Sequence, residues 1–437
     1  MIWAWIAAAV AISWLFCKKG ISWYHYIWLL LPIEMYGVTI AGATLKPYML
    51  FGICIIASDL VRDKTIRVPV AIIAAVFALI ISDFLTGFVM ASVMQHIMFI
   101  LVLMIGFCYQ HRQKDGIEFE EMGQATLATT IGYGIVFTVA WLMFSRGITP
   151  DGVYASERLE PGIVLRLASF GGNVSQRMRG FCIDPNSVIT TLIPGAAYAL
   201  ANVVYRKQEI VKSILALAVY LAVVVYSGSR MALMCTFVML TIFFVIGYKR
   251  ANNKRQVLVV GMAILGVILI GLISNIDAVI LEVAKMWESI FGERASLGSE
   301  YGRLTIWKTN IQYLIGNNKE LFGVGQNQIY LLTERGLACH NTWLEWICGT
   351  GIFLGVAIDL WFILAPLKYK KRAIGLGDEN TKNAIPLIMA YVIVVVCIST
   401  VDNITNSVLL FLMLILRYGT INPVSYTHLT LPTTPYV

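Results

Sequence analysis

The chain has 437 residues, of which 58% are hydrophobic and 13% are charged. Roughly a quarter of the residues in a soluble globular domain are charged, so this composition excludes a soluble fold and indicates a protein dissolved in the lipid bilayer. The net charge of +8 would suggest a nucleic-acid partner in a soluble protein. In a membrane protein it is better explained by the orientation of the loops, so we expect no nucleic-acid partner.

Thirteen apolar runs approach the roughly 20 residues that a helix needs to cross the hydrocarbon. They begin near Ile2, Ile21, Tyr48, Pro69, Phe88, Gln124, Ser187, Ser213, Met231, Gln256, Trp343, Ala384 and Val408. The third run is short, so it starts earlier, tilts little or is re-entrant. The first is either an addition to a twelve-helix core or an uncleaved signal-like segment. We predict an all-α polytopic integral membrane protein with about 12–13 transmembrane helices, forming one domain over residues 1–422.

Basic residues predict the orientation, because positively charged short loops remain in the cytoplasm. The loops that we place there hold nineteen of the 33 Lys and Arg residues, whereas the short outer turns hold only Lys46 and Arg230. Strict alternation over thirteen spans then puts the N-terminus outside and the C-terminus inside.

Two long excursions interrupt this pattern on the outer side, over residues 145–185 and 275–339. The second contains two apolar patterns at helical spacing, formed by Ile280, Val283, Ala284, Trp287, Ile290 and Phe291, and by Leu304, Trp307, Ile311, Leu314 and Ile315. These patterns predict amphipathic helices that lie on the outer membrane surface and shelter a polar site.

The C-terminal tail and the cysteines give no indication of a functional site. Residues 423–437 change abruptly to an uncharged Thr- and Pro-rich sequence that resembles translated adapter read-through, and we regard this tail as non-native. The eight cysteines lack CxxC spacing, so they indicate no metal or redox site. Only Cys182 and Cys339 lie near the outer face, where a disulfide is chemically possible. We favour the interpretation that Cys182 and Cys339 are two small apolar residues at helix ends.

A polar motif precedes the span near Ser187. Residues 179–186 have the sequence RGFCIDPN, and Asp or Asn around a proline suits the start of a helix. For Asp184 and Asn186, helix capping and ligand binding are therefore equally favoured.

Two further motifs present arginine at the outer face. Residues 227–230, SGSR, form a four-residue hairpin that holds Arg230 at the membrane boundary. Arg230 either snorkels to the surface or binds substrate, and the cost of an ionisable group at this depth favours substrate binding. Residues 302–307, GRLTIW, place Arg303 one turn before Trp307, where a cation–π contact and phosphate binding are equally plausible.

The last motif, residues 340–346 with the sequence HNTWLEW, starts a span. Asn341 and Glu345 are four residues apart and share a helix face, whereas His340 points elsewhere. His340 either caps the helix or acts in chemistry. The GTGIFLG sequence of residues 349–355 follows, and its glycines allow close helix contact.

Taken in order, these motifs resemble the O-antigen ligase and O-antigen polymerase superfamily, over about residues 124–417. The most specific parts are SGSR, GRLTIW, LFGVGQNQ and HNTWLEW followed by GTGIFLG. The resemblance implies that a glycan passes from an undecaprenyl-diphosphate carrier to a sugar hydroxyl, on a glycan or lipid-core acceptor. It implies a site at the outer face of the bacterial cytoplasmic membrane and no metal or other cofactor. The family's functional residues fall on Arg179, Arg230, Arg303 and His340.

We therefore predict an inverting, metal-independent glycosyltransferase. His340 is the predicted base, and Arg230 and Arg303, with Arg179, hold the diphosphate. The remaining substrate-binding candidates are Asn341, Glu345, Asp184 and Asn186. The outer regions hold nine arginines against four lysines, a bias that favours bidentate phosphate recognition. The chain has no DxD pair, so guanidinium charge must stabilise the leaving group.

The alternative from another class is a transporter or flippase of lipid-linked glycans, which would also use charges within the membrane. Against it, such charges are few (Glu34, His96 and Asp359), and no inverted repeat is evident in the sequence. The choice between a polymerase and a ligase stays open, because the two differ only in the acceptor, which the sequence does not identify.

Overall fold

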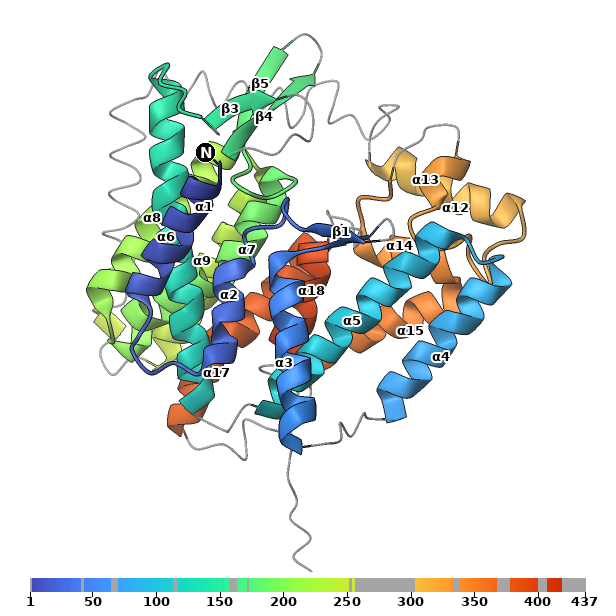
Figure 1. Ribbon diagram of the computed structural model, residues 1–437, viewed down its shortest axis with the longest axis horizontal. Helices are drawn as coiled ribbons and strands as arrows, with labels where there is room; N and C mark the ends of the chain where they lie inside the picture. The colour runs from blue at the N-terminus through green and yellow to red at the C-terminus, as the bar shows by residue number, and fades with distance from the viewer. Residues whose placement is uncertain are drawn as a thin grey trace, which may run out of the picture.

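The computed structural model describes most of the chain (Figure 1). The described residues are 2–40, 43–63, 70–112, 117–151, 153–156, 163–170, 173–250, 254–255, 303–333, 338–367, 378–399 and 407–418. The span predicted to begin near Gln256, the amphipathic helix predicted over residues 280–291 and the tail from residue 423 lie outside them.

The fold is mostly helical, which confirms the predicted class of polytopic membrane protein. Four stretches are long and apolar enough to cross a membrane: α5 (Met90–Arg112), α6 (Ile117–Ser145), α7 (Pro185–Ala201) continued by η2 (Asn202–Arg206), and α8 (Ile210–Ser227). Shorter apolar stretches lie in α1 (Ile2–Phe16), α4 (Val70–Leu85), α9 (Arg230–Arg250), α15 (Ile352–Ile363) and α17 (Asp378–Ile393) continued by η3 (Val394–Ile398). The remaining helices are η1 (Trp23–Tyr26), α2 (Ile27–Leu30), α3 (Pro47–Asp63), α12 (Arg303–Gly316), α13 (Ile329–Leu332), α14 (Thr342–Thr350) and α18 (Ser407–Leu416).

α7 lies at the centre of the core and every residue from Ser187 to Ala201 is buried. α6 packs against it closely: a Cβ on Gly195 would lie 2.2 Å from the carbonyl oxygen of Thr126. Small residues allow helix backbones to approach in this way. The core therefore holds α7 in a fixed position.

The predicted span near Ile21 is wrong as a continuous helix. Its helical part ends after α2, because Pro32 lacks the N–H that the next turn would need. The chain continues as an irregular loop to β1 (Val38–Ile40). Met35 N–H donates to the carbonyl of Phe181 at 2.9 Å, and Cys182 Sγ donates to the carbonyl of Pro32 at 3.5 Å. Irregular backbone is tolerated here because it is buried in protein.

The predicted span near Trp343 is also interrupted. α14 ends at Thr350, and Gly351 adopts φ +84°, a conformation that favours glycine. α15 then packs back against α14, since a Cβ on Gly355 would lie 2.7 Å from the backbone of Ile347. A Cβ on Gly351 would meet the carbonyl oxygen of Leu321 at 2.0 Å. The glycines therefore do allow close contact, but they break the helix as well.

Two small sheets were not predicted. One is the antiparallel pair of β1 and β2 (Ala43–Leu45). The other lies within the outer excursion of residues 145–185 and has the order β3 (Val153–Ser156), β4 (Ile163–Phe170), β5 (Asn173–Met178), with β3 parallel and β5 antiparallel to β4. The β4–β5 register pairs Phe170 with Asn173 and Leu165 with Met178. Figure 1 shows this sheet along the upper edge of the molecule, near the N-terminus.

The second helix predicted in the excursion of residues 275–339 is present as α12, and its place on the membrane surface stays a prediction. It buries Ile306, Asn310 and Leu314 and exposes Leu304, Ile311 and Ile315. The exposed apolar side chains are suited to the membrane surface that we predict for this helix.

The predicted orientation has a direct test, because Lys254 and Lys308 are both exposed. We expect a cysteine at position 308 to react with an impermeant reagent on intact cells, and one at position 254 to react only after the cells are opened. The background carries Cys17→Ser and Cys54→Ser, since the other six cysteines are buried. Labelling of position 254 in intact cells would reverse the assigned face.

Candidate active site

Asp184 caps the N-terminal end of α7. Its carboxylate Oδ1 accepts the N–H of Asn186 at 2.7 Å, and Pro185 occupies the first helical position, where its missing N–H costs nothing. The capping interpretation is confirmed for Asp184. Whether Asp184 also touches substrate stays a prediction.

Asn186 instead joins the first motif to the SGSR hairpin. Ser229 Oγ donates to Asn186 Oδ1 at 2.6 Å and accepts the N–H of Ala232 at 3.1 Å, which caps α9. Gly228 forms the turn with φ +55°. Arg230 is the first residue of α9, so its backbone is fixed next to the N-terminal end of α7.

Two arginines approach this junction from β5 and the loop that follows it. Arg179 is fully buried, at 1% exposure, and its charge acts on the neighbouring Cys182 thiol. Arg177 donates from Nε to the carbonyl of Ser227 at 3.0 Å. Arg177 was not among the predicted site residues. No local motif marks it, because its partner Ser227 lies 50 residues further along the chain.

Glu34 was considered as a charge within the membrane, but the structure places it in the loop after α2, against the start of α7. Its Oε2 accepts the N–H of Ile183 at 3.3 Å. Burial raises the pKa of Glu34 to about 7, and the nearby Lys46 opposes that rise. Burial in turn lowers the pKa of Lys46. Glu34 and Lys46 therefore lie close to each other near the N-terminal end of α7.

His340 lies immediately before α14. It is exposed and has φ +47°, a strained value for a residue other than glycine. Asn341 is the cap of α14, because its side chain accepts the N–H of Leu344 at 3.0 Å. The interpretation of His340 as the cap is therefore wrong. Glu345 is buried one turn further along the helix.

α12 is tied to the residue that precedes His340. Trp307 Nε1 donates to the carbonyl of Cys339 at 2.9 Å, and Asn310 Nδ2 lies 3.2 Å from Cys339 Sγ. Arg303 begins α12 one turn before Trp307, and one turn of helix rises about 5.4 Å. The third and fourth motifs are therefore brought together.

The loop of residues 323–328, inside the LFGVGQNQ motif, packs beneath α14. Four consecutive backbone N–H groups have protein acceptors: Val324 to Cys348 O at 2.9 Å, Gly325 to Gly349 O at 3.0 Å, Gln326 to Ser92 Oγ at 2.8 Å, and Asn327 to Glu345 Oε1 at 3.0 Å. The first two satisfy carbonyls at the C-terminal end of α14, which lack helical partners. The loop therefore fixes both ends of the helix that carries Glu345.

η3 connects the two halves of the candidate site. Thr342, the first residue of α14, donates its N–H to the carbonyl of Ser399 at 2.8 Å. Two residues earlier, the thiol of Cys397 is in hydrogen-bond contact with Cys235, which lies in the second turn of α9. The second turn of α9 and the start of α14 therefore both lie close to η3.

The cysteines and the possible metal ligands are the remaining polar candidates. Cys182 and Cys339 are buried free thiols, as favoured from the sequence. In the part of the chain that the structure describes, no group of three or more His, Cys, Asp or Glu side chains is arranged to hold a metal ion. The chemistry that the site offers is an exposed imidazole, buried carboxylates and guanidinium groups.

Comparison with known families supplies one finding. Residues 215–358 match the family described as O-Antigen ligase. The matched segment runs from α8 into α15, and includes the SGSR hairpin, α12, the 323–328 loop and α14. Arg179, Asp184 and Asn186 precede it and reach it through the Asn186–Ser229 hydrogen bond. No curated protein matches the chain.

Proposed function

The chain is a multi-pass membrane protein that carries an O-antigen ligase family domain over residues 215–358, and on that premise we propose that it is a lipid-linked glycan transferase. The donor is a glycan on undecaprenyl diphosphate, and the acceptor is a sugar hydroxyl of a glycan or a lipid core. Transfer takes place at the outer face of the bacterial cytoplasmic membrane. Polymerases and ligases break the same bond, so the proposal covers both.

In this reaction the acceptor hydroxyl attacks the anomeric carbon and the diphospholipid leaves from the opposite side. A sugar hydroxyl is a weak nucleophile, so the proton transfer most worth catalysing is its removal, which we assign to His340. Negative charge develops on the diphosphate as the bond breaks. Arg230 and Arg303, with Arg179, are assigned to that charge, because a guanidinium presents a planar fork to phosphate oxygens.

One observation supports this assignment above the others: η3 packs against α9, and Ser399, the residue after η3, accepts the N–H of Thr342 at the start of α14. An arginine and a histidine separated by about 110 residues of sequence are thereby carried by neighbouring helix starts. A base on one side and cations on the other are what an in-line displacement requires.

Reconstitution tests the function directly. Purified protein in vesicles is given a radiolabelled lipid-linked glycan and an acceptor glycan, and product is separated by chromatography. We expect acceptor-dependent elongation. Movement of the labelled lipid across the bilayer without any new glycosidic bond would instead identify a flippase.

Transfer should persist in excess EDTA. The leaving group is assigned to guanidinium charge, and the outer carboxylates that the sequence offers, such as Glu300 and Glu334, are isolated from one another along the chain. The measurement compares initial rates with and without chelator in the same vesicles. Loss of activity that returns only when Mg²⁺ or Mn²⁺ is added back would contradict the arginine-based account.

A further inference from the structure

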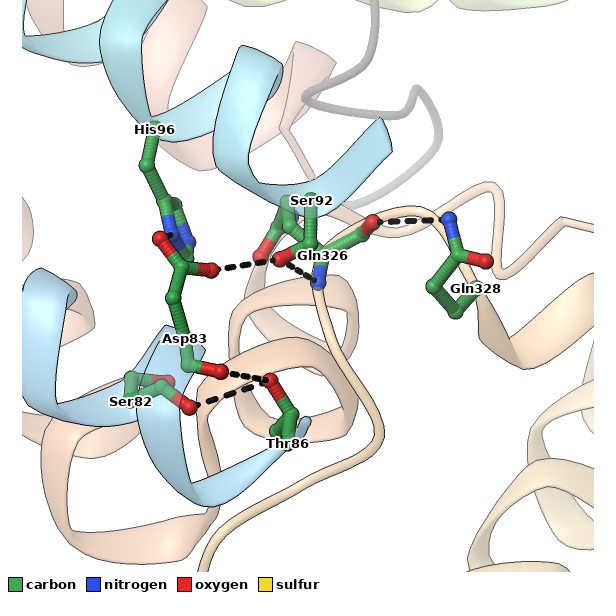
Figure 2. Close-up of polar contacts among 7 residues, drawn as sticks. All are labelled: Ser82, Asp83, Thr86, Ser92, His96, Gln326 and Gln328. Carbon is green, nitrogen blue, oxygen red and sulfur yellow. Dashed lines mark hydrogen bonds and ion pairs between the residues drawn. The ribbon is translucent and has the colours of Figure 1, made fainter. Parts of the chain in front are cut away.

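A buried polar cluster lies at the turn between α4 and α5, apart from the residues assigned to the reaction (Figure 2). Asp83 Oδ2 lies 2.9 Å from His96 Nδ1, and Asp83 Oδ1 accepts the hydroxyl of Ser92 at 3.0 Å. Asp83, Ser92 and His96 are all buried. Two neighbours on α5 thus hold both oxygens of one α4 carboxylate, which fixes its orientation.

Ser92 connects the Asp83 carboxylate to the 323–328 loop by a second hydrogen bond. Its hydroxyl donates to Asp83, so its oxygen is free to accept the N–H of Gln326, at 2.8 Å. Figure 2 shows the resulting chain from Asp83 through Ser92 to the backbone of Gln326. The approach is close, because a Cβ on Gly325 would lie 3.3 Å from Ser92 Cβ. A charged acceptor strengthens the hydrogen bond that polarises the Ser92 hydroxyl.

The loop then reaches the candidate active site. The residue after Gln326 is Asn327, whose N–H donates to Glu345 Oε1 at 3.0 Å. Asn327 has φ +56°, so its amide direction depends on a backbone conformation that needs support from its neighbours. Glu345 is in the first turn of α14 and is separated from His340 by the Asn341 cap and three further residues.

We propose that Asp83, Ser92 and His96 are positioning residues, which act through the 323–328 loop to hold the Glu345 carboxylate in the first turn of α14, the helix that follows His340. The proposal rests on the function proposed above. Asp83 and His96 touch no part of the reacting groups in this account. Asp83 and His96 fix the position of the Ser92 side chain. Ser92 fixes the backbone of Gln326 and Asn327, and the Asn327 N–H orients the Glu345 carboxylate.

Ser92→Ala removes the hydroxyl that joins Asp83 to the Gln326 N–H and changes the size of the side chain by one oxygen atom. We expect kcat for glycan transfer to fall about tenfold at equal amounts of folded protein, because the Gln326 amide loses its buried acceptor and the loop relaxes. KM for the lipid-linked donor should stay unchanged, since the diphosphate is assigned to arginines elsewhere. A purely structural role would instead lower the amount of folded protein and leave kcat per folded molecule unchanged, which would overturn the proposal.

Thr86→Val is the matched control in the same turn. The Thr86 hydroxyl donates to the carbonyls of Ser82 at 3.0 Å and Asp83 at 3.2 Å, within its own turn. We expect kcat to be unchanged. An equal loss in Thr86→Val and Ser92→Ala would attribute the effect to the turn as a whole and would overturn the proposal.

A double-variant cycle tests whether Ser92 acts through Glu345. If the cluster acts through Glu345, Ser92→Ala should cost about tenfold in the native background and less than twofold in a Glu345→Gln background. Losses that multiply would show that Ser92 acts independently of Glu345. Asp83→Asn repeats the cycle with a variant that keeps the size of the side chain, should Ser92→Ala not accumulate.

The two proposals fail differently. Absence of transfer by the unaltered protein, with a fully folded sample, contradicts the proposed function. Normal transfer by the unaltered protein together with an unchanged kcat in Ser92→Ala contradicts only the positioning role.

Discussion

Replacing His340 with alanine should reduce glycan transfer by about 10²- to 10⁴-fold, the usual contribution of a positioned general base. Protein abundance and binding of the lipid-linked donor should change little, because His340 is exposed and is not the cap of α14. Initial rates in vesicles and donor binding are measured on the same preparation. His340→Gln should be as inactive, since an amide accepts a hydrogen bond but does not take up a proton near neutral pH.

The glutamine variant decides between a base and a positioning group. Near-normal transfer by His340→Gln would mean that His340 only orients the acceptor. Glu345 is then the first candidate for the base, because its carboxylate lies one turn into α14. His111→Ala is a useful control, since His111 lies at the last turn of α5 and bonds with Asp59, away from the candidate site. We expect it to retain transfer.

Replacing Arg230 with lysine should lower the rate about ten- to a hundredfold, which corresponds to roughly 1.5–3 kcal/mol for a charge-assisted contact. Lysine preserves the charge but not the planar fork that binds two phosphate oxygens together. The measurement is kcat/KM with the lipid-linked donor varied.

Arg146 provides the comparison for Arg230. It follows α6 on the same side of the predicted topology and has no assigned role, so Arg146→Lys should keep full activity. Normal turnover and unaltered donor affinity in Arg230→Lys would reduce Arg230 to an anchor that snorkels at the membrane boundary.

The helical fold and the helix at residues 303–316 followed from sequence patterns. Apolar runs of span length predicted α5 to α8, and apolar spacing predicted α12, because both signals depend on local composition alone. The capping alternatives were also local, and the structure decides them: Asp184 and Asn341 are caps, whereas Asn186 bonds to Ser229.

The features that sequence reasoning missed depend on contacts between distant segments. The break after α2 is stable only because Phe181 and Cys182 bond to the loop around Pro32. The link from Asp83 to Glu345 passes through α4, α5, the 323–328 loop and α14, and no periodic pattern connects those four segments. Local periodicity carries no information about such pairings, since it reports only which face of one element is apolar.

The glycine-containing loop of residues 323–328 has a consequence for how an anion is recognised. In nucleotide-binding loops, glycine-rich backbone N–H groups point outward and cradle phosphate oxygens. Here the N–H groups of Val324, Gly325, Gln326 and Asn327 already bond to protein oxygens, so this loop has no such donors to offer. A diphosphate that binds beside this loop is therefore not held by the loop's backbone amides, and we expect the arginine side chains assigned above to recognise it. Its affinity should therefore respond to the loss of individual arginines and to salt, as a cradle made of backbone amides would not.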